Sequence, residues 1–174
     1  MRILLALCAL LALASWAFAQ QPTFAPVLNI RDFGAVADGV ADDTAAFQAA
    51  LEAGRQQQLP VYLPRGDYRL TQTIRVEQQL LTGEFVGGWP ADGAPIAKLW
   101  IDHSEGPGIL LTAGGSLNGF GLFYDWTKHE DFEPAILLTS ANGTSITNLR
   151  LQYPKDGIIM DESGHGRNQF RDIF

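Results

Sequence analysis

The chain has 174 residues, of which 47% are hydrophobic and 18% are charged, and its formal net charge is −7 at pH 7. This acidic balance disfavours nucleic acid and anionic membranes as partners, because both carry negative charge themselves. A polyanionic substrate would also be repelled unless local basic residues or a bridging divalent cation compensated.

The first residues predict export. Met1 and Arg2 precede an apolar core from Ile3 to Leu13, and Ala17-Phe18-Ala19 before Gln20 is a small-x-small cleavage site. We therefore expect a signal peptide over residues 1–19, a linker over 20–28, a secreted or periplasmic location and no membrane contact after cleavage. The only cysteine, Cys8, lies inside the predicted signal peptide, so the exported chain has no disulfide, which favours a bacterial protein.

Residues 29–70 predict an amino-terminal cap made of a helix and short strands. Asp38-Gly39 is a turn pair, and Asp42 or Asp43 can accept hydrogen bonds from the free amides of a helix that begins at Thr44. Apolar positions then recur at helical spacing, and short strands follow at 61–63 and 68–70, on either side of a Pro-Arg-Gly-Asp turn. Such a helix can cover the open edge of a following sheet. The residues expected on its buried face are Phe47, Ala50, Leu51 and Gly54.

Residues 71–174 contain two interleaved repeats. One apolar pattern begins at Gly108, Ala135 and Gly157, and a second occupies 117–120, 146–149 and 170–173. Their recurrence every 22 to 29 residues, with polar turns between them, predicts coils of a β-solenoid in which each strand stacks on its equivalent. In the second pattern the apolar parity changes between Leu117 and Phe120, so we expect the strand to bend there. The chain stops within the third copy of this pattern, which suggests an incomplete solenoid whose exposed last coil promotes association.

The segment Asp-Phe-Gly-Ala-Val-Ala-Asp-Gly-Val-Ala-Asp-Asp-Thr at 32–44, followed by the helix and by Val-Tyr-Leu-Pro-Arg-Gly-Asp-Tyr at 61–68, resembles the start of pectate-lyase-superfamily proteins of the polygalacturonase and rhamnogalacturonase kind. The resemblance implies an all-β solenoid, a right-handed parallel β-helix with an N-terminal capping α-helix. It also implies that the opening motif is architectural and that catalytic residues lie several coils further on, largely beyond Phe174.

The longest interruption between coils runs from Phe123 to Pro134. Long insertions on a regular scaffold often carry function. Its aromatic side chains could stack on sugar rings while its charged side chains hydrogen-bond sugar hydroxyls. The alternative is a solvated loop whose aromatic residues pin it to the surface. The predicted substrate-binding residues are Tyr124, Asp125, Trp126, Lys128 and Asp131.

A second candidate group includes Asp161 and His165 as possible catalytic residues. Glycoside hydrolysis needs two carboxyl groups that flank the scissile bond, and a lyase needs a base beside a group that neutralises the acid. The alternative is a Gly-rich turn with an exposed His165. The sequence predicts no metal site and no cofactor, with calcium open if the protein is a lyase.

The first residues predict secretion, and the resemblance implies a protein active on polysaccharide, the N-terminal part of a glycoside hydrolase or polysaccharide lyase. The alternative is a non-catalytic carbohydrate-binding or adhesion module of the same fold. The oligomeric state, the sugar and the linkage stay open.

Overall fold

The computed structural model describes residues 26–84, 96–129, 131–163 and 166–174. The predicted signal peptide, most of the predicted linker and His165 lie outside these ranges. No helix among the described residues is both long and apolar enough to cross a membrane.

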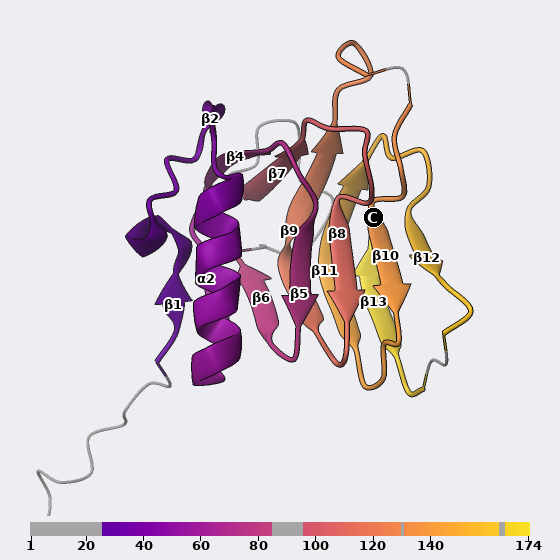
Figure 1. The fold of residues 1–174 in the computed structure, drawn as a ribbon. Helices are drawn as coiled ribbons and strands as arrows, with labels where there is room; N and C mark the ends of the chain where they lie inside the picture. Colours follow the sequence, from indigo (N-terminus) through magenta and orange to yellow (C-terminus); the bar gives the residue numbers. More distant parts are fainter. Residues whose placement is uncertain (1–25, 85–95, 130, 164–165) are drawn as a thin grey trace, which may run out of the picture.

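The described residues are mostly β-structure, and every strand pairing is parallel. One α-helix and one 3-10 helix lie near the amino terminus, before most of the strands (Figure 1). The elements in chain order are β1 (Leu28–Asn29), η1 (Ile30–Phe33), β2 (Asp38–Asp42), α2 (Thr44–Gln57), β3 (Val61–Leu63), β4 (Gly66–Leu70), β5 (Ile74–Glu77), β6 (Leu80–Gly83), β7 (Ala97–Ile101), β8 (Ile109–Thr112), β9 (Ser116–Tyr124), β10 (Ile136–Thr139), β11 (Ser145–Gln152), β12 (Ile158–Met160) and β13 (Gln169–Ile173).

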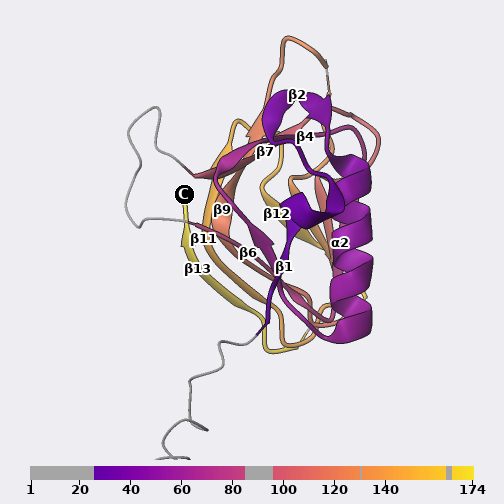
Figure 2. The same ribbon diagram turned by 90° about the vertical axis from the view of Figure 1, so that its left-hand side faces the viewer.

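The strands form two curled sheets around a shared core. The four-stranded sheet has the order β12-β10-β8-β5, and α2 lies beside β5 at its edge (Figure 1). The nine-stranded sheet is bent because its long strand β9 pairs with β6 through its first residues and with β7 through its last ones. Figure 2 shows the successive strands stacked behind one another, with α2 on one side of the stack.

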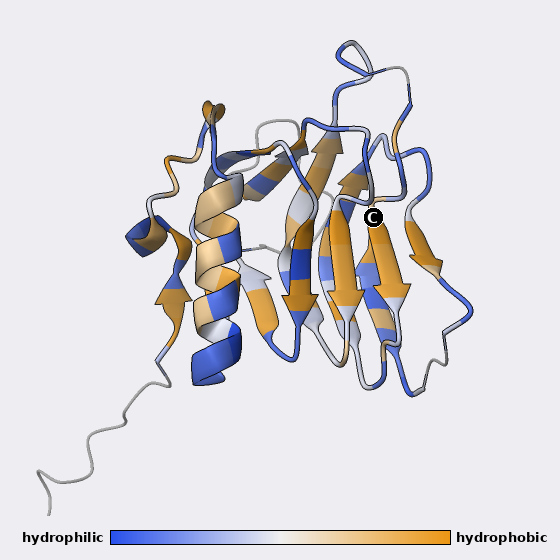
Figure 3. Ribbon diagram, viewed as in Figure 1, coloured by the Kyte–Doolittle hydropathy of each residue, from blue (hydrophilic) through white to orange (hydrophobic). Residues whose placement is uncertain are grey.

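Both predicted repeats are confirmed by the strand registers. Ile136 pairs with Ile109 on one side and with Ile158 on the other. Ile146 likewise pairs with Leu117 and with Phe170. Alternating apolar residues therefore point into the core at each level, and Figure 3 shows the resulting hydrophobic residues along β8, β10 and β12.

The predicted bend between Leu117 and Phe120 is also present, and it recurs at each level. Gly119, Asn148 and Asp172 all have left-handed backbones, with φ of 76°, 52° and 53°, and the registers on either side place them above one another. Asn118 supports the bend from the neighbouring position. Its Oδ1 accepts hydrogen bonds from Thr147 Oγ1 at 2.9 Å and from Asn148 Nδ2 at 2.8 Å.

Helix α2 begins at Thr44, as predicted, and its four expected apolar residues are buried. The two aspartates before it have separate roles. Asp42 Oδ1 accepts from the Thr44 amide at 3.0 Å, whereas the carboxylate of Asp43 accepts from the amides of Val36 and Ala37 at 2.7 and 3.1 Å. Asp42 is thus the side chain that stabilises the helix start, and Asp43 fixes the preceding loop. The expected turn at Asp38-Gly39 lies at the start of strand β2.

Candidate functional site

The loop between β9 and β10 connects three successive coils. It begins at Asp125, whose Oδ1 accepts from the amide and hydroxyl of Thr127 at 3.0 and 2.6 Å and so folds the loop back on itself. One side of the loop contacts the residues that follow β7, and the other side contacts the residues that follow β11.

On the β7 side the loop is held by a single carboxylate. Asp102 accepts from Arg69 of β4, and its carboxylate oxygens lie 3.6 Å from Lys128 Nζ and 3.2 Å from His129 Nε2. The Asp102 side chain is only 12% exposed. Partial burial by itself would raise the pKa of Asp102, but the hydrogen bonds from Arg69 and His129 and the charge of Lys128 outweigh it and lower that pKa. Asp102 therefore stays ionised and fixes the loop to the neighbouring coil.

A depression of about 290 Å³ lies beside this carboxylate. Its volume is at the lower end of the range for small-molecule sites. The groups that line it are hydroxyl, amide, imidazole and carboxylate groups, which can both donate to and accept from sugar hydroxyls. They belong to Thr71, Gln72, Asp102, His103, Ser104, Glu105 and His129.

His103 is the most buried member of this lining, and its Nδ1 lies 3.1 Å from the carbonyl oxygen of Glu105. Burial lowers the pKa of His103, against the opposing effect of that carbonyl. Its Nε2 has no hydrogen-bond partner among the described residues. The neutral imidazole is therefore the favoured form in the fold.

On the β11 side the loop is held by two hydrogen bonds. Trp126 Nε1 donates to the carbonyl oxygen of Tyr153 at 2.7 Å, and Lys155 Nζ donates to Asp131 Oδ1 at 2.7 Å. Phe132, which is buried, contacts the Trp126 ring edge-on with centroids 4.9 Å apart. These contacts fix the orientation of the loop against the following coil.

The five predicted binding residues therefore have different environments. Tyr124 is buried against Phe132, and its hydroxyl has no partner among the described residues. Asp125 folds its own loop, Lys128 faces Asp102, and only Trp126 is a large exposed apolar side chain among the five. The sequence-based set omitted three neighbouring side chains, namely Asp102, His129 and Tyr153.

Asp161, the predicted catalytic carboxylate, lies in a turn at the end of β12. Its Oδ1 accepts from the amide of Ser163 at 2.9 Å and from the Ser163 hydroxyl, which in turn accepts from the Ser140 amide at 2.6 Å. These contacts place Asp161 in a polar turn. Its predicted companion, His165, lies outside the described residues.

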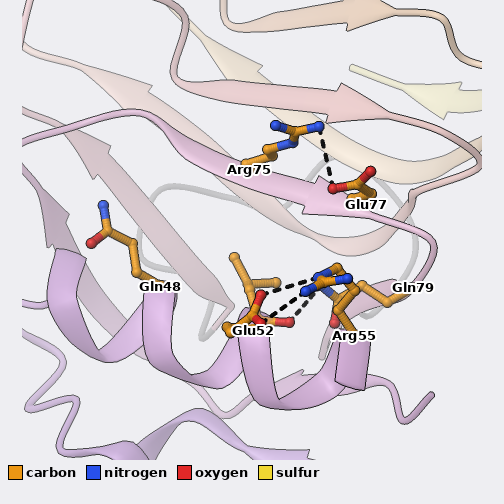
Figure 4. A pocket seen from close by; sticks show the side chains of 7 residues that line it. Gln48, Glu52, Arg55, Arg75, Glu77 and Gln79 are labelled. Carbon is orange, nitrogen blue, oxygen red and sulfur yellow. Dashed lines mark hydrogen bonds and ion pairs between the residues drawn. The ribbon is translucent and has the colours of Figure 1, made fainter. Parts of the chain in front are cut away.

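A second depression, of about 150 Å³, separates α2 from β5 (Figure 4). The charged side chains that line it form ion pairs within the same helix or the same strand. Glu52 lies 2.8 Å from Arg55 on the helix, and Arg75 lies 3.2 Å from Glu77 on the strand. Because the charges are neutralised locally, this groove is a packing seam with a solvated surface. Among the described residues, no group of three His, Cys, Asp or Glu side chains is placed to hold a metal.

Comparison with known proteins identifies the relatives of this chain. Residues 27–90 match the family described as rhamnogalacturonase A/epimerase, pectate lyase-like. The mannuronan C5-epimerase AlgE1 of Azotobacter vinelandii is 54% identical over 44 residues, which are 25% of this chain and 3% of the relative. A probable glucan endo-1,3-beta-glucosidase of Arthroderma benhamiae is 41% identical over 126 residues, covering 63% of this chain and 14% of the relative. A probable polygalacturonase of Arabidopsis thaliana is 29% identical over 151 residues, covering 77% of this chain and 30% of the relative.

Solved structures share the fold. The A-module of the Azotobacter vinelandii mannuronan C-5 epimerase AlgE4 superposes with a TM-score of 0.58 at 20% identity, over 84% of this chain and 44% of that one. The Streptococcus pneumoniae surface adhesin PfbA superposes with a TM-score of 0.56 at 19% identity, over 73% of this chain and 35% of that one. The chain spans less than a third of the length of these curated relatives. The family match over residues 27–90 and the polygalacturonase relative agree with a resemblance to the pectate lyase superfamily, and the solved structures share the fold.

Proposed function

We propose that this chain is the amino-terminal part of a secreted polysaccharide-active enzyme, a glycoside hydrolase or a polysaccharide lyase. The observation that carries the proposal is the agreement among the relatives, because a glucosidase, a polygalacturonase and an epimerase named for mannuronan all match this chain. In this proposal the coils form a right-handed β-helix, α2 caps its first edge, and residues 1–19 direct export.

The geometry of the described residues fits glycan binding better than bond cleavage. Asp102 is committed to Arg69, Lys128 and His129, and Asp161 is committed to its own turn. Glu105 also lines the depression beside Asp102, but the oxygens of Asp102 are taken up by Arg69, Lys128 and His129. We therefore assign binding to the loop between β9 and β10 and place the cleavage chemistry on further coils of a longer protein.

A non-catalytic carbohydrate-binding or adhesion module is the second candidate. It is favoured by the likeness in fold to the adhesin PfbA and by the engagement of Asp102 with Arg69, Lys128 and His129. In that case the loop would bind glycan and no further coil would cleave it.

An assay on two versions of the protein separates these proposals. The chain as given should bind polysaccharide with weak or no depolymerising activity, and a version extended by further coils should be active. Reducing ends report hydrolysis, and unsaturated uronides report elimination. Binding without either product by the extended version would favour the adhesion module. If neither version binds or cleaves any glycan tested, both proposals fail.

A further inference from the structure

Two successive loops meet at the β9–β10 connection and expose one aromatic residue each. Trp126 is 41% exposed and Tyr153 is 68% exposed. The loops are joined by the bond from Trp126 Nε1 to the Tyr153 carbonyl and by the Lys155–Asp131 pair, each 2.7 Å long. The Trp126 ring is fixed by its bond to Tyr153 and by its contact with Phe132, and a fixed ring loses little conformational freedom when it binds a ligand.

Tyr153 has a backbone conformation that its side chain does not favour. Its φ is 58°, in the left-handed region, which is uncommon for a bulky residue. Gln152 pairs with Phe123 of the preceding coil, so Tyr153, the next residue, corresponds to Tyr124. The Tyr124 ring is buried. Tyr153 instead projects its ring into solvent, and among the described residues its hydroxyl makes no hydrogen bond. Exposed Gln58 has a similar backbone, so the feature that points to binding is the exposed Tyr153 ring itself.

One ion pair lies beside the two rings, and further carboxylates, Glu133 and Asp156, are near its lysine. Asp131 and Lys155 form an ion pair, with side chains 73% and 49% exposed. The pair can still donate to and accept from hydroxyl groups, but it adds no net charge at the surface. The chain as a whole is acidic, so an anionic ligand would be repelled. A ligand with an apolar face and neutral hydroxyl groups fits this surface.

We infer that Trp126 and Tyr153, with the Asp131–Lys155 pair, bind a neutral pyranose unit of a glycan through the face of the ring that carries its axial C–H bonds. Tyr153 is a binding residue in this assignment. The inference rests on the proposed polysaccharide function and names both the surface and the class of sugar that it takes.

The variant Tyr153→Gly separates binding from folding. Glycine removes the ring and relieves the left-handed backbone, so the melting temperature should rise by about 2–4 °C. Affinity for cellohexaose or mannohexaose, measured by calorimetry on the whole chain, should fall about tenfold. Trp126→Ala should weaken binding by a similar factor.

Gln58→Gly is the matched control. Gln58 is exposed beyond the end of α2, with φ of 56°, so glycine relieves the same strain far from the loops. This variant should melt higher and bind cellohexaose or mannohexaose with unchanged affinity.

If the parent chain binds a neutral probe and Tyr153→Gly binds it equally well, the inference is overturned while the proposed function stands. Tight binding of hexagalacturonate alone overturns the neutral-sugar assignment. If the parent chain and its extended version bind none of the glycans, the proposed function fails and this inference fails with it.

Discussion

Two aspartates before α2 accept hydrogen bonds from backbone amides, one at a buried position and one at an exposed position. Asp43 is buried and holds two amides of the loop before β2, at Val36 and Ala37. Asp38 makes the same kind of contact at an exposed position, where its Oδ1 accepts from Val40 and Ala41 at 2.8 Å each. Exposed amides can bond to water instead, but buried ones cannot.

Asp43→Ala should therefore lower the free energy of unfolding by about 1–3 kcal/mol, since it removes a buried carboxylate that accepts two part-buried backbone hydrogen bonds. Asp38→Ala, the matched exposed variant, should cost less than about 1 kcal/mol. Urea denaturation at pH 7 measures both values. Equal losses in the two variants would show that burial does not determine the role of Asp43.

Buried His103 should make stability depend on pH. The groups that face it are Asp102, Glu105 and His129, and burial lowers its pKa in the folded chain. The unfolded chain therefore takes up a proton near the ordinary pKa, while the folded chain does so only at lower pH. The stability contribution is fully present above the unfolded-state pKa and is lost as pH falls through the folded-state pKa.

Between pH 7.5 and 5.5 the free energy of unfolding should thus decrease, with a slope of up to about 1.4 kcal/mol per pH unit from this residue. His103→Gln should flatten the slope in denaturant titrations at several pH values. His129→Gln is the control for a second imidazole in the same depression. A slope that His103→Gln leaves unchanged would assign the pH dependence to other groups.

At the scale of the elements, Gly54 determines how closely α2 approaches the strands. A Cβ atom at this position would lie 2.9 Å from the Leu59 carbonyl oxygen and 3.0 Å from Val61 Cγ2, and it would clash with Gln79 Oε1. The Gln79 side chain is itself held by the bond from its Nε2 to the Leu51 carbonyl at 2.8 Å. Two of the three obstacles are therefore fixed or backbone atoms.

Gly54→Ala should destabilise the protein by about 1–3 kcal/mol, although alanine is the better helix former by about 1 kcal/mol. Thermal and urea denaturation measure the change. The control Ala49→Gly, at an exposed position of the same helix, should lose only the propensity difference of about 1 kcal/mol. Stabilisation by Gly54→Ala would mean that the helix can move away from the strands at little cost.

The sequence predicts the elements well and the site poorly, and the reason is physical. Alternating apolar residues that recur at regular intervals determine which strands pair and in which register. Both repeats and the bend at Gly119 could therefore be predicted. Burial of Tyr124 was predictable too, because Phe120, Leu122 and Tyr124 are spaced two apart and face the core. In contrast, the contact of Asp102 with Lys128 and His129 joins successive coils across irregular loops, where no periodicity indicates which side chains meet.

At the scale of the whole molecule, the two edges of the strand stack differ in how they are covered. At the amino-terminal edge α2 packs beside β5 and against η1. At the other edge, among the described strands, β12 pairs with β10 alone and β13 pairs with β11 alone. Core-facing positions are open there, since Met160 is 51% exposed and Phe170 is 43% exposed. Together with Ile158, these residues line an apolar depression of about 200 Å³.

An apolar edge with unpaired strands favours association with another chain. Light scattering on the chain as given should therefore show a mass that rises with protein concentration. Phe170→Glu should reduce this association, because it places a charge within the exposed apolar edge. Val40→Glu, at an exposed valine near the opposite edge, should leave the association unchanged. A monodisperse monomer with a single cooperative melt at every concentration would contradict the prediction and would mean that this edge is tolerated in water without a partner.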